Sequence, residues 1–386
     1  MLSNKMNRIN PSLTLELSAK INRMKSEGRR IYNFTVGEPD FKTPRYIINE
    51  TMSFLDNSIV RYTDTSGLSE LRELISQKLK NVNKINCTKD SIVVSTGAKQ
   101  AIVNSLFAIT NRNDDVLIPS PYWLSYPEMC KITDCTPVIL PYNDSYKIDV
   151  KILDKYKTDK TKCLILNNPS NPTGVIYSKN ELTEIGNWAV KNNIYIISDE
   201  IYERLSYDVD YVSIASISDE INDITITING FSKSYAMTGF RLGYSCSNNE
   251  IAALIKRLQG HITSNANTIS QVAGIAALKN EKKEVDEMII EFKKRRDYIT
   301  SKLDDMNLKY IYPEGAFYIF IKVDEFFNST IKNSLDFCDF LLSYYNVALI
   351  PGVVFGEDNF VRMSYATKID DIKLGISILK KFINEL

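Results

Sequence analysis

The spacing of apolar residues predicts a first stretch made mainly of helices. Residues 12–30 carry leucine, isoleucine and methionine at spacings of three and four, which predicts a helix that ends at a glycine. A short strand is predicted over 31–36, followed by a Gly-Glu-Pro-Asp turn over 37–40. Two further helices are predicted over 44–55 and 68–79.

The middle of the chain alternates short apolar runs with turns and with segments of helical period. Buried strands are predicted over 91–96, 116–119, 163–167, 194–197 and 226–228. The intervening helices include 101–109 and one that begins at a capping box of Ser178 and Glu181. This alternation predicts an α/β fold with a largely parallel sheet covered by helices.

After residue 250 the pattern becomes mainly helical and then mixed. A long charged helix is predicted over 281–303, and strands are predicted over 316–322, 347–350 and 360–365. We expect this smaller α+β part to pack with the N-terminal residues as a second domain.

Composition is that of an ordinary soluble globular protein. Of the 386 residues, 44% are apolar and 24% are charged, and 47 lysines and arginines balance 47 aspartates and glutamates. No overall field therefore attracts nucleic acid or a membrane, and no apolar run approaches the about 18 residues of a membrane span. The six cysteines lack metal-binding spacing, and no signal-peptide run follows the first residues. We expect a cytoplasmic protein with reduced cysteines and no metal site.

Two absences from the sequence narrow the possible chemistry. The chain has one histidine, His261, which excludes catalytic arrangements and metal sites that need several imidazoles. No two glycines stand two residues apart, so no G-x-G-x-x-G motif exists, and no Walker A motif is present. If the chain is an enzyme, we expect a bound cofactor to supply its chemistry.

Candidate functional residues follow the predicted strands, and in parallel sheets such residues gather beyond the carboxyl ends of the strands. Those with this position are Gly97, Trp123, Asn171, Asp199 and Lys233. Gly97 opens a helix, which leaves the amides of Ala98 and Lys99 free to bind an anion. Trp123 can stack on a flat ligand or fill the core, and the turn around Asn171 is also compatible with plain turn chemistry.

Lys233 lies among aromatic and apolar residues, including Phe231 and Tyr235. Its amine is therefore either exposed on a loop or partly desolvated. Desolvation lowers the pKa of a lysine and makes the amine a nucleophile toward carbonyl groups. Arg241 follows eight residues later and presents a planar fork that can bind a phosphate.

A set of motifs covers nearly the whole chain in order. They are Val-Gly-Glu-Pro-Asp-Phe at 36–41, Tyr62, Ser-Pro-Tyr-Trp-Leu-Ser-Tyr-Pro-Glu at 120–128, Asn-Asn-Pro-Ser-Asn-Pro-Thr-Gly at 167–174, Ser-Asp-Glu-Ile-Tyr at 198–202, Ser-Lys-Ser at 232–234 with Arg241, and Phe-Val-Arg-Met-Ser-Tyr-Ala at 360–366. With these motifs the chain resembles the class I aminotransferases, which are pyridoxal-phosphate enzymes of fold type I. It is most similar to the prokaryotic-type aspartate aminotransferases, some of which also act on prephenate.

The resemblance implies a large domain over residues 46–284 with a mostly parallel seven-stranded sheet. Residues 1–45 and 285–386 would form the smaller α+β domain. The implied cofactor is pyridoxal 5'-phosphate, and the implied reaction is a ping-pong transfer of an amino group between an amino acid and a 2-oxo acid.

The resemblance also implies roles for individual residues at the cofactor ring. Lys233 would bind the cofactor covalently and would then move a proton at the substrate α carbon. Asp199 would keep the pyridine nitrogen protonated, and Trp123 would stack on the ring. Asn171 and Tyr202 would hydrogen-bond the phenolic oxygen.

The phosphate group of the cofactor would be held by charged and backbone groups of two subunits. The implied phosphate residues are Arg241, Ser232, the Ala98 and Lys99 amides beyond Gly97, and Tyr62 of the neighbouring subunit. A homodimer with shared active sites is therefore implied.

Substrate recognition would depend on two charged side chains. The resemblance implies that Arg362, aided by the Gly37 backbone and beside Trp123 and Asn171, binds the α-carboxylate. Lys99 and Thr14 would bind a second carboxylate. The expected donor is therefore L-aspartate or glutamate, with 2-oxoglutarate or oxaloacetate as acceptor. Prephenate or an aromatic substrate is the alternative.

Two departures from the family pattern and two other protein classes complete the comparison. Ser170 stands where the motif often has asparagine, and Gly230 replaces a phosphate-binding serine of other subgroups. A carbon–sulfur lyase on the same scaffold is one alternative class. The other class is a non-catalytic regulator, but this chain has no basic segment or additional length for a DNA-binding domain.

Overall fold

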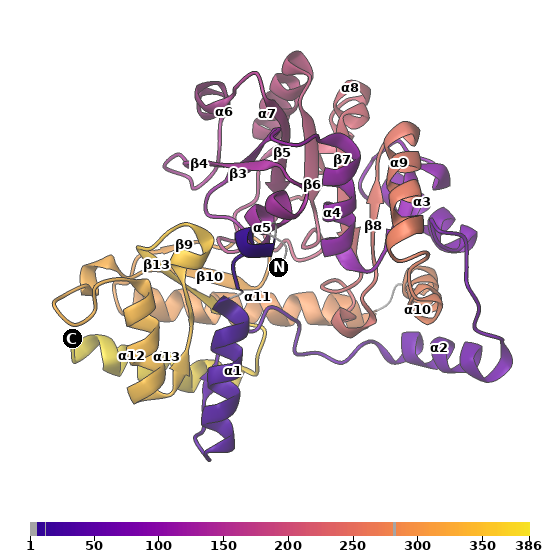
Figure 1. The fold of residues 1–386 in the computed structure, drawn as a ribbon. Coiled ribbons are helices and arrows are strands. Elements are labelled where there is room, and N and C mark those ends of the chain that lie inside the picture. The colour runs from indigo at the N-terminus through magenta and orange to yellow at the C-terminus, as the bar shows by residue number, and fades with distance from the viewer. Residues whose placement is uncertain (1–5, 12, 281–282) are drawn as a thin grey trace.

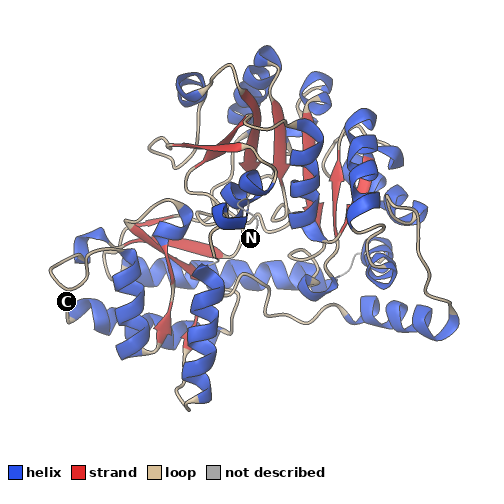
Figure 2. Cartoon of the chain, in the orientation of Figure 1, coloured by secondary structure: helices blue, strands red, loops and turns tan. Residues whose placement is uncertain are grey.

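The computed structural model describes residues 6–11, 13–280 and 283–386. Its largest sheet has seven strands in the order β2-β8-β7-β6-β5-β3-β4 (Figure 1, Figure 2). The strands are β2 Ile92–Ser95, β3 Asp115–Pro119, β4 Thr136–Leu140, β5 Thr161–Asn167, β6 Tyr195–Asp199, β7 Thr225–Gly230 and β8 Gly243–Cys246. All neighbours are parallel except β8, which runs antiparallel to β2 and β7. The predicted α/β class with a mostly parallel sheet is confirmed.

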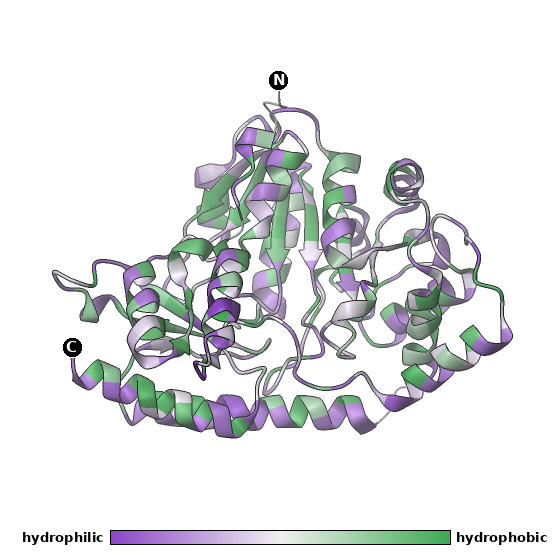
Figure 3. Cartoon of the chain, turned by 60° about the horizontal axis from the view of Figure 1, so that its bottom comes forward, coloured by the Kyte–Doolittle hydropathy of each residue, from purple (hydrophilic) through white to green (hydrophobic). Residues whose placement is uncertain are grey.

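Helices cover both faces of this sheet because its strands are apolar on both faces. Ile165 of β5 packs with residues of α4, α5 and α9, whereas its neighbours Leu164 and Leu166 pack with residues of α6, α7 and α8. Successive residues of a strand point to opposite faces, so a strand that is buried on both faces is apolar throughout. The strands at the centre of Figure 3 are accordingly mostly green. The helices are α4 Gly97–Ile109, α5 Ser125–Ile132, α6 Val150–Tyr156, α7 Lys179–Asn192, α8 Asp219–Asp223 and α9 Asn249–Ile262.

A second group of elements surrounds a smaller antiparallel sheet of order β12-β13-β10-β9. Beside it, β1 pairs in parallel with β11, which brings the N-terminal residues against the C-terminal part of the chain. Buried phenylalanines, among them Phe317, Phe337 and Phe382, fill the core of this group. Its strands are β1 Tyr32–Asn33, β9 Tyr310–Ile311, β10 Tyr318–Lys322, β11 Val347–Ala348, β12 Ile350–Pro351 and β13 Phe360–Ser364. Its helices are α1 Leu13–Ser26, α11 Lys283–Asp304, α12 Ser334–Tyr345 and α13 Ile369–Asn384.

Three more helices form a further layer. They are α2 Arg45–Asn57, α3 Ser69–Asn81 and α10 Thr268–Lys279. In this layer α3 contacts β2, and α10 packs against both α2 and α3. Figure 1 shows α11 running below the seven-stranded sheet. The division into domains at 46–284 and the remainder stays a prediction. Among the described helices, none combines the length and the apolar character that a membrane crossing needs.

Several element boundaries differ from the sequence expectations. The strand expected over 31–36 is only the two residues of β1, because its partner β11 is equally short. The strand expected over 347–350 is divided between β11 and β12, which belong to different sheets. Strands β4 and β8 were not expected, and both are short. Three residues of the expected helices, Ser12, Glu281 and Lys282, lie outside the described residues.

Candidate active site

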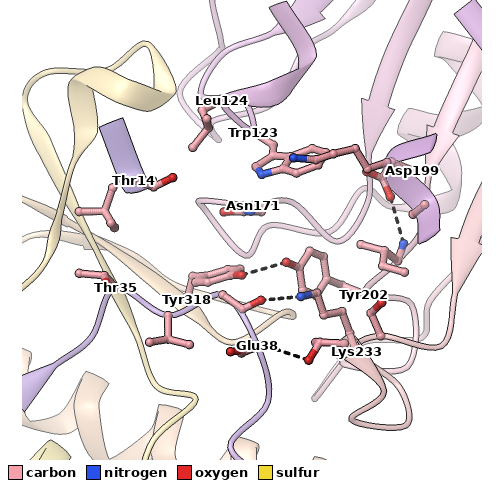
Figure 4. Close-up of a pocket in the computed structure, with 18 of the residues that line it drawn as sticks. Thr14, Thr35, Glu38, Trp123, Leu124, Asn171, Asp199, Tyr202, Lys233 and Tyr318 are labelled. Atoms are coloured by element: carbon pink, nitrogen blue, oxygen red, sulfur yellow. Dashed lines mark hydrogen bonds between the residues drawn. The ribbon is translucent and has the colours of Figure 1, made fainter. Parts of the chain in front are cut away.

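A cavity of about 610 Å³ lies beyond the carboxyl ends of β5, β6 and β7 (Figure 4). Of the site residues expected from the sequence, all but Gly97 and Tyr62 line this cavity. They are Thr14, Gly37, Ala98, Lys99, Trp123, Asn171, Asp199, Tyr202, Ser232, Lys233, Arg241 and Arg362. We call the part formed by residues 98–241 the sheet side. We call the part formed by Thr14, Gly37, Tyr318 and Arg362 the opposite side.

Lys233 lies just after β7, and its amine points into the cavity toward the opposite side (Figure 4). The amine donates a hydrogen bond to the carbonyl of Gly37 and lies 5.8 Å from the centre of the Phe317 ring. Burial lowers the pKa of the Lys233 amine to about 8. Among the nearby charges, the Glu38 carboxylate has the largest effect on this pKa and raises it. Of the two alternatives for the Lys233 amine, exposed on a loop or partly desolvated, the structure therefore supports the second.

Asp199 ends strand β6 and is 3% exposed. Its Oδ2 accepts a hydrogen bond of 2.7 Å from the Tyr126 hydroxyl, and its Oδ1 accepts one of 3.3 Å from the Ile201 amide. Burial raises the pKa of Asp199 to about 6, while the bond from Tyr126 opposes that shift. Tyr126 lies within the 120–128 motif, but sequence reasoning assigned it no function. Its position in the first turn of α5 was the missing information.

The loop after β5 connects the two sides of the cavity. The Asn171 amide donates a hydrogen bond of 2.8 Å to Asn167 Oδ1, which fixes the turn. Asn171 Oδ1 in turn accepts a bond of 2.9 Å from Arg362 Nη1. The hydroxyls of Tyr202 and Tyr318 also meet across the cavity at 2.9 Å. Tyr318 was not expected as a site residue, because its strand gave no signal beyond apolar character.

Positive charge and free backbone amides gather where α4 begins. Gly97 and Arg241 both have left-handed backbone conformations, with φ angles of 80° and 53°. A Cβ atom at Gly97 would lie 2.5 Å from Arg241 Nη2, so only glycine lets the guanidinium pass over this turn. Gly97 therefore leaves the space that the Arg241 side chain occupies, and it does not itself line the cavity. The amides of Ala98 and Lys99 at this helix start are suited to an anion.

Trp123 and Lys99 lie together on the sheet side. The Lys99 amine is 4.9 Å from the centre of the Trp123 ring, which itself contacts the Tyr126 ring edge-on at 5.3 Å. Burial lowers the pKa of Lys99, and the Arg241 cation lowers it further. The pair thus places a cation and a flat aromatic surface in the same cavity.

Arg362 of β13 is 5% exposed and forms the main charged group of the opposite side. Its Nη2 donates a hydrogen bond of 3.0 Å to the carbonyl of Thr35, and its guanidinium lies 4.2 Å from the centre of the Tyr318 ring. Burial lowers the pKa of Arg362, and its Nε has no hydrogen-bond partner within the described part of the chain. An oriented guanidinium with an unused donor is suited to a carboxylate.

Two expected or neighbouring residues complete the description. Tyr62 is 89% exposed and lies away from the cavity, in a surface hollow with Arg61 and Asn267.

Glu38 follows Gly37 in the 36–41 motif, lines the cavity and accepts a hydrogen bond of 2.8 Å from the Thr238 hydroxyl. Sequence reasoning assigned Glu38 no function, because nothing local shows that its loop reaches Lys233.

Comparisons with known proteins agree with this geometry. The family model described as aminotransferase class I and II matches residues 29–377. An aspartate aminotransferase of Bacillus sp. (strain YM-2) is 40% identical to this chain, with 99% of each chain covered. A bifunctional aspartate aminotransferase and glutamate/aspartate-prephenate aminotransferase of Petunia hybrida is 38% identical, over 98% of this chain and 82% of that protein. The crystal structure of an aspartate aminotransferase from Thermotoga maritima matches with a TM-score of 0.94 and 36% identity, over 99% of this chain and 100% of that one.

Proposed function

The chain belongs to the family of class I and II aminotransferases, and on that premise we propose that it transfers the amino group of L-aspartate or glutamate to a 2-oxo acid such as 2-oxoglutarate, with pyridoxal 5'-phosphate as its cofactor. The observation that carries this proposal is that one cavity contains Lys233, Arg362 and Lys99. These residues supply a desolvated amine and two cations, as a dicarboxylic amino acid requires.

The residues of the cavity fit the proposed cofactor. The glycine at 97 lets Arg241 lie over the start of α4, where the Ala98 and Lys99 amides and Ser232 can bind a phosphate. Asp199 is a buried carboxylate that can pair with a ring nitrogen, and Trp123 provides a surface for stacking. When bound, pyridoxal phosphate supplies an electron sink for the bond that breaks at the substrate α carbon.

Lys233 is suited both to covalent attachment and to proton transfer. Because burial lowers its pKa to about 8, a fraction of its amine is neutral near pH 7. A general base works best when its pKa is close to the working pH, so Lys233 Nζ can accept a proton from the substrate α carbon and return it elsewhere. Asp199, which accepts a hydrogen bond from Tyr126, would supply a negative charge to the ring nitrogen of the cofactor.

Arg362 is the proposed ligand of the substrate α-carboxylate. Its two Nη atoms are already oriented by Asn171 Oδ1 and the Thr35 carbonyl, so the fork loses little freedom when it binds. Gly37 lies beside it and contributes backbone atoms. At the other end of the cavity, Lys99 and Thr14 are proposed to bind the second carboxylate.

A second candidate acceptor is prephenate. It is also a dicarboxylic 2-oxo acid, and the Petunia relative is named for aspartate-prephenate activity as well as for aspartate activity. Lys99 and Arg362 would bind its two carboxylates. The presence of both cations in one cavity therefore supports prephenate and 2-oxoglutarate alike as acceptors.

We further propose a homodimer that shares its active sites. Tyr62 does not line the cavity of its own chain, and it lies with Ile59 and Val60 on an exposed apolar surface. A partner that covers this surface would bury these side chains and receive Tyr62 near its own phosphate residues. We place the enzyme in the cytoplasm, since the cysteines are free and buried.

Initial rates with two varied substrates test the proposal. We expect parallel double-reciprocal lines for L-aspartate with 2-oxoglutarate, as a ping-pong reaction requires. The same assay with prephenate as acceptor ranks the two candidates. If L-cystathionine released a thiol, pyruvate and ammonia without any added 2-oxo acid, the result would instead indicate carbon–sulfur lyase chemistry.

A further inference from the structure

One short segment, residues 35–41, contacts both reactive sides of the cavity. The Thr35 carbonyl accepts a hydrogen bond from Arg362, and the Gly37 carbonyl accepts one from Lys233. Glu38 accepts the bond from Thr238, just before the turn that carries Arg241. The position of this segment therefore sets two distances. One is from the Thr35 carbonyl to the Arg362 guanidinium, and the other is from the Gly37 carbonyl to the Lys233 amine.

The far end of the same segment is held by Arg295 of α11, which does not line the cavity. Arg295 Nη1 donates a hydrogen bond of 2.7 Å to Asp40 Oδ1 and one of 3.3 Å to the carbonyl of Tyr365. Its guanidinium lies 5.0 Å from the centre of the Phe41 ring and 5.5 Å from that of Phe292. The Arg295 side chain is 6% exposed and that of Asp40 is 23% exposed, so this ion pair is largely withdrawn from water.

Tyr365 connects this anchor to the substrate side. It follows Arg362 by three residues, and the Ser364 amide between them donates a hydrogen bond of 2.9 Å to the Phe34 carbonyl. Arg295 thus contacts the end of the 35–41 segment and the end of β13 at the same time. The Arg295 guanidinium therefore links residues 35–41 to the end of β13, and the proposed α-carboxylate position lies between these two segments.

We propose that Arg295 and Asp40 are positioning residues for the substrate, because their ion pair sets the place of residues 35–41 beside Arg362. The proposal rests on the function proposed above, since the substrate carboxylate is the group that Arg362 would bind. Neither residue touches the cavity, so both act through Thr35 and Gly37. A misplacement of about 1 Å in such a segment can cost up to about 10²-fold in activity.

The neighbouring arginine of α11 offers a matched control. Arg296 has a side chain that is 1% exposed, is paired with Asp208 and Asp297, and lies 4.9 Å from the centre of the Tyr207 ring. Its burial and its stacked, ion-paired setting are like those of Arg295. None of these partners lines the cavity, however. Asp208→Asn therefore weakens an ion pair of the neighbouring buried arginine, although the Asp208 side chain is 48% exposed, and should not move residues 35–41.

The test compares Asp40→Asn with Asp208→Asn in the full-length holoenzyme. For Asp40→Asn we expect the KM for L-aspartate to rise about tenfold while kcat changes little. The Kd of succinate, a dicarboxylate that lacks the amino group, should also rise about tenfold when it is measured by calorimetry. Amide hydrogen exchange over residues 35–41 should accelerate in the same variant. Asp208→Asn should leave KM, the succinate Kd and this exchange unchanged. Arg295→Lys, which keeps the charge but loses the planar fork, should resemble Asp40→Asn.

The outcomes separate this proposal from the proposed function. Asp40→Asn with normal exchange over 35–41 and a normal succinate Kd would overturn the positioning role, even if its melting temperature fell. Equal effects of Asp208→Asn on KM would also overturn it, because the effect would then be general destabilisation. In a further outcome, the wild-type protein transaminates no amino acid while exchange over residues 35–41 still differs as expected between Asp40→Asn and Asp208→Asn. That result would overturn the proposed function and leave the anchoring of the segment intact.

Discussion

The two sides of the cavity are built in different ways. On the sheet side, Asp199 is the last residue of the buried strand β6 and is paired within the sheet, and Lys233 follows the end of β7 by three residues. On the opposite side, Arg362 binds the carbonyl of Thr35, which lies 327 residues away in the chain. The side chains of the opposite side therefore depend on contacts between distant segments.

This difference suggests a division of labour. Groups that move protons need a fixed position and a shifted pKa, and both follow from burial at a strand end. Groups that recognise the substrate can lie on segments whose position is set by a few side-chain contacts. Substitutions on the sheet side should therefore reduce kcat, while those on the opposite side should raise KM.

The largest expected effect is that of Lys233→Ala. Without the amine, neither covalent attachment nor proton transfer at the α carbon is available, so kcat should fall by about 10⁴-fold or more. Steady-state rates with L-aspartate and 2-oxoglutarate measure the loss, and the melting temperature of the cofactor-free protein serves as control. Retention of more than a small part of the activity would remove Lys233 from the centre of the account.

The next effect is that of Asp199→Asn. An amide cannot supply the negative charge that the ring nitrogen would need, so kcat should fall by about 10²- to 10³-fold with little change in KM. Tyr126→Phe removes only the hydrogen bond that Asp199 accepts and serves as the milder comparison. If the two variants lost activity equally, the charge of Asp199 would not be the important property.

Arg362→Lys tests the opposite side. A lysine keeps the positive charge but cannot replace the planar fork held by Asn171 and Thr35, so KM for the amino acid should rise about 10²-fold. The effect on kcat should be smaller. A loss confined to kcat would contradict the division between the two sides.

Lys99→Ala probes an exception, because Lys99 lies on the sheet side but is proposed to recognise substrate. Loss of one charge-assisted hydrogen bond should lower kcat/KM for L-aspartate about tenfold relative to L-alanine. Thr14→Val should change the same ratio less. If the ratio of aspartate to alanine turnover did not change in Lys99→Ala, the dicarboxylate assignment would be wrong.

The smallest expected effect concerns the pH dependence of Lys233. Its pKa is lowered to about 8, so covalent attachment of pyridoxal phosphate to cofactor-free protein should accelerate as the pH rises and level off above about pH 8. Glu38 raises this pKa, so Glu38→Gln should move the midpoint to lower pH. A shift to higher pH in stopped-flow measurements would contradict this electrostatic role.

The sheet and most of the sheet side could be predicted from sequence because their signals are local. Apolar runs that end at Asp199 or just before Lys233 predict both the strand and the exposed edge beyond it. The partners Tyr126, Tyr318 and Glu38 were not predicted as site residues, because each reaches the site through a tertiary contact. Strand β8 is short, and its pairing with β2 and β7 depends on the whole sheet. The role of Tyr62 at the phosphate of a neighbouring subunit stays a prediction.

The most direct test of the central claim is the visible absorption spectrum of the purified protein with pyridoxal phosphate, before and after L-aspartate is added without any 2-oxo acid. The account predicts that the band of the lysine-bound cofactor gives way to the band of its amine form, and that 2-oxoglutarate restores it. A coloured protein that does not respond to L-aspartate would contradict the substrate assignment. A protein that binds no pyridoxal phosphate would contradict the account as a whole.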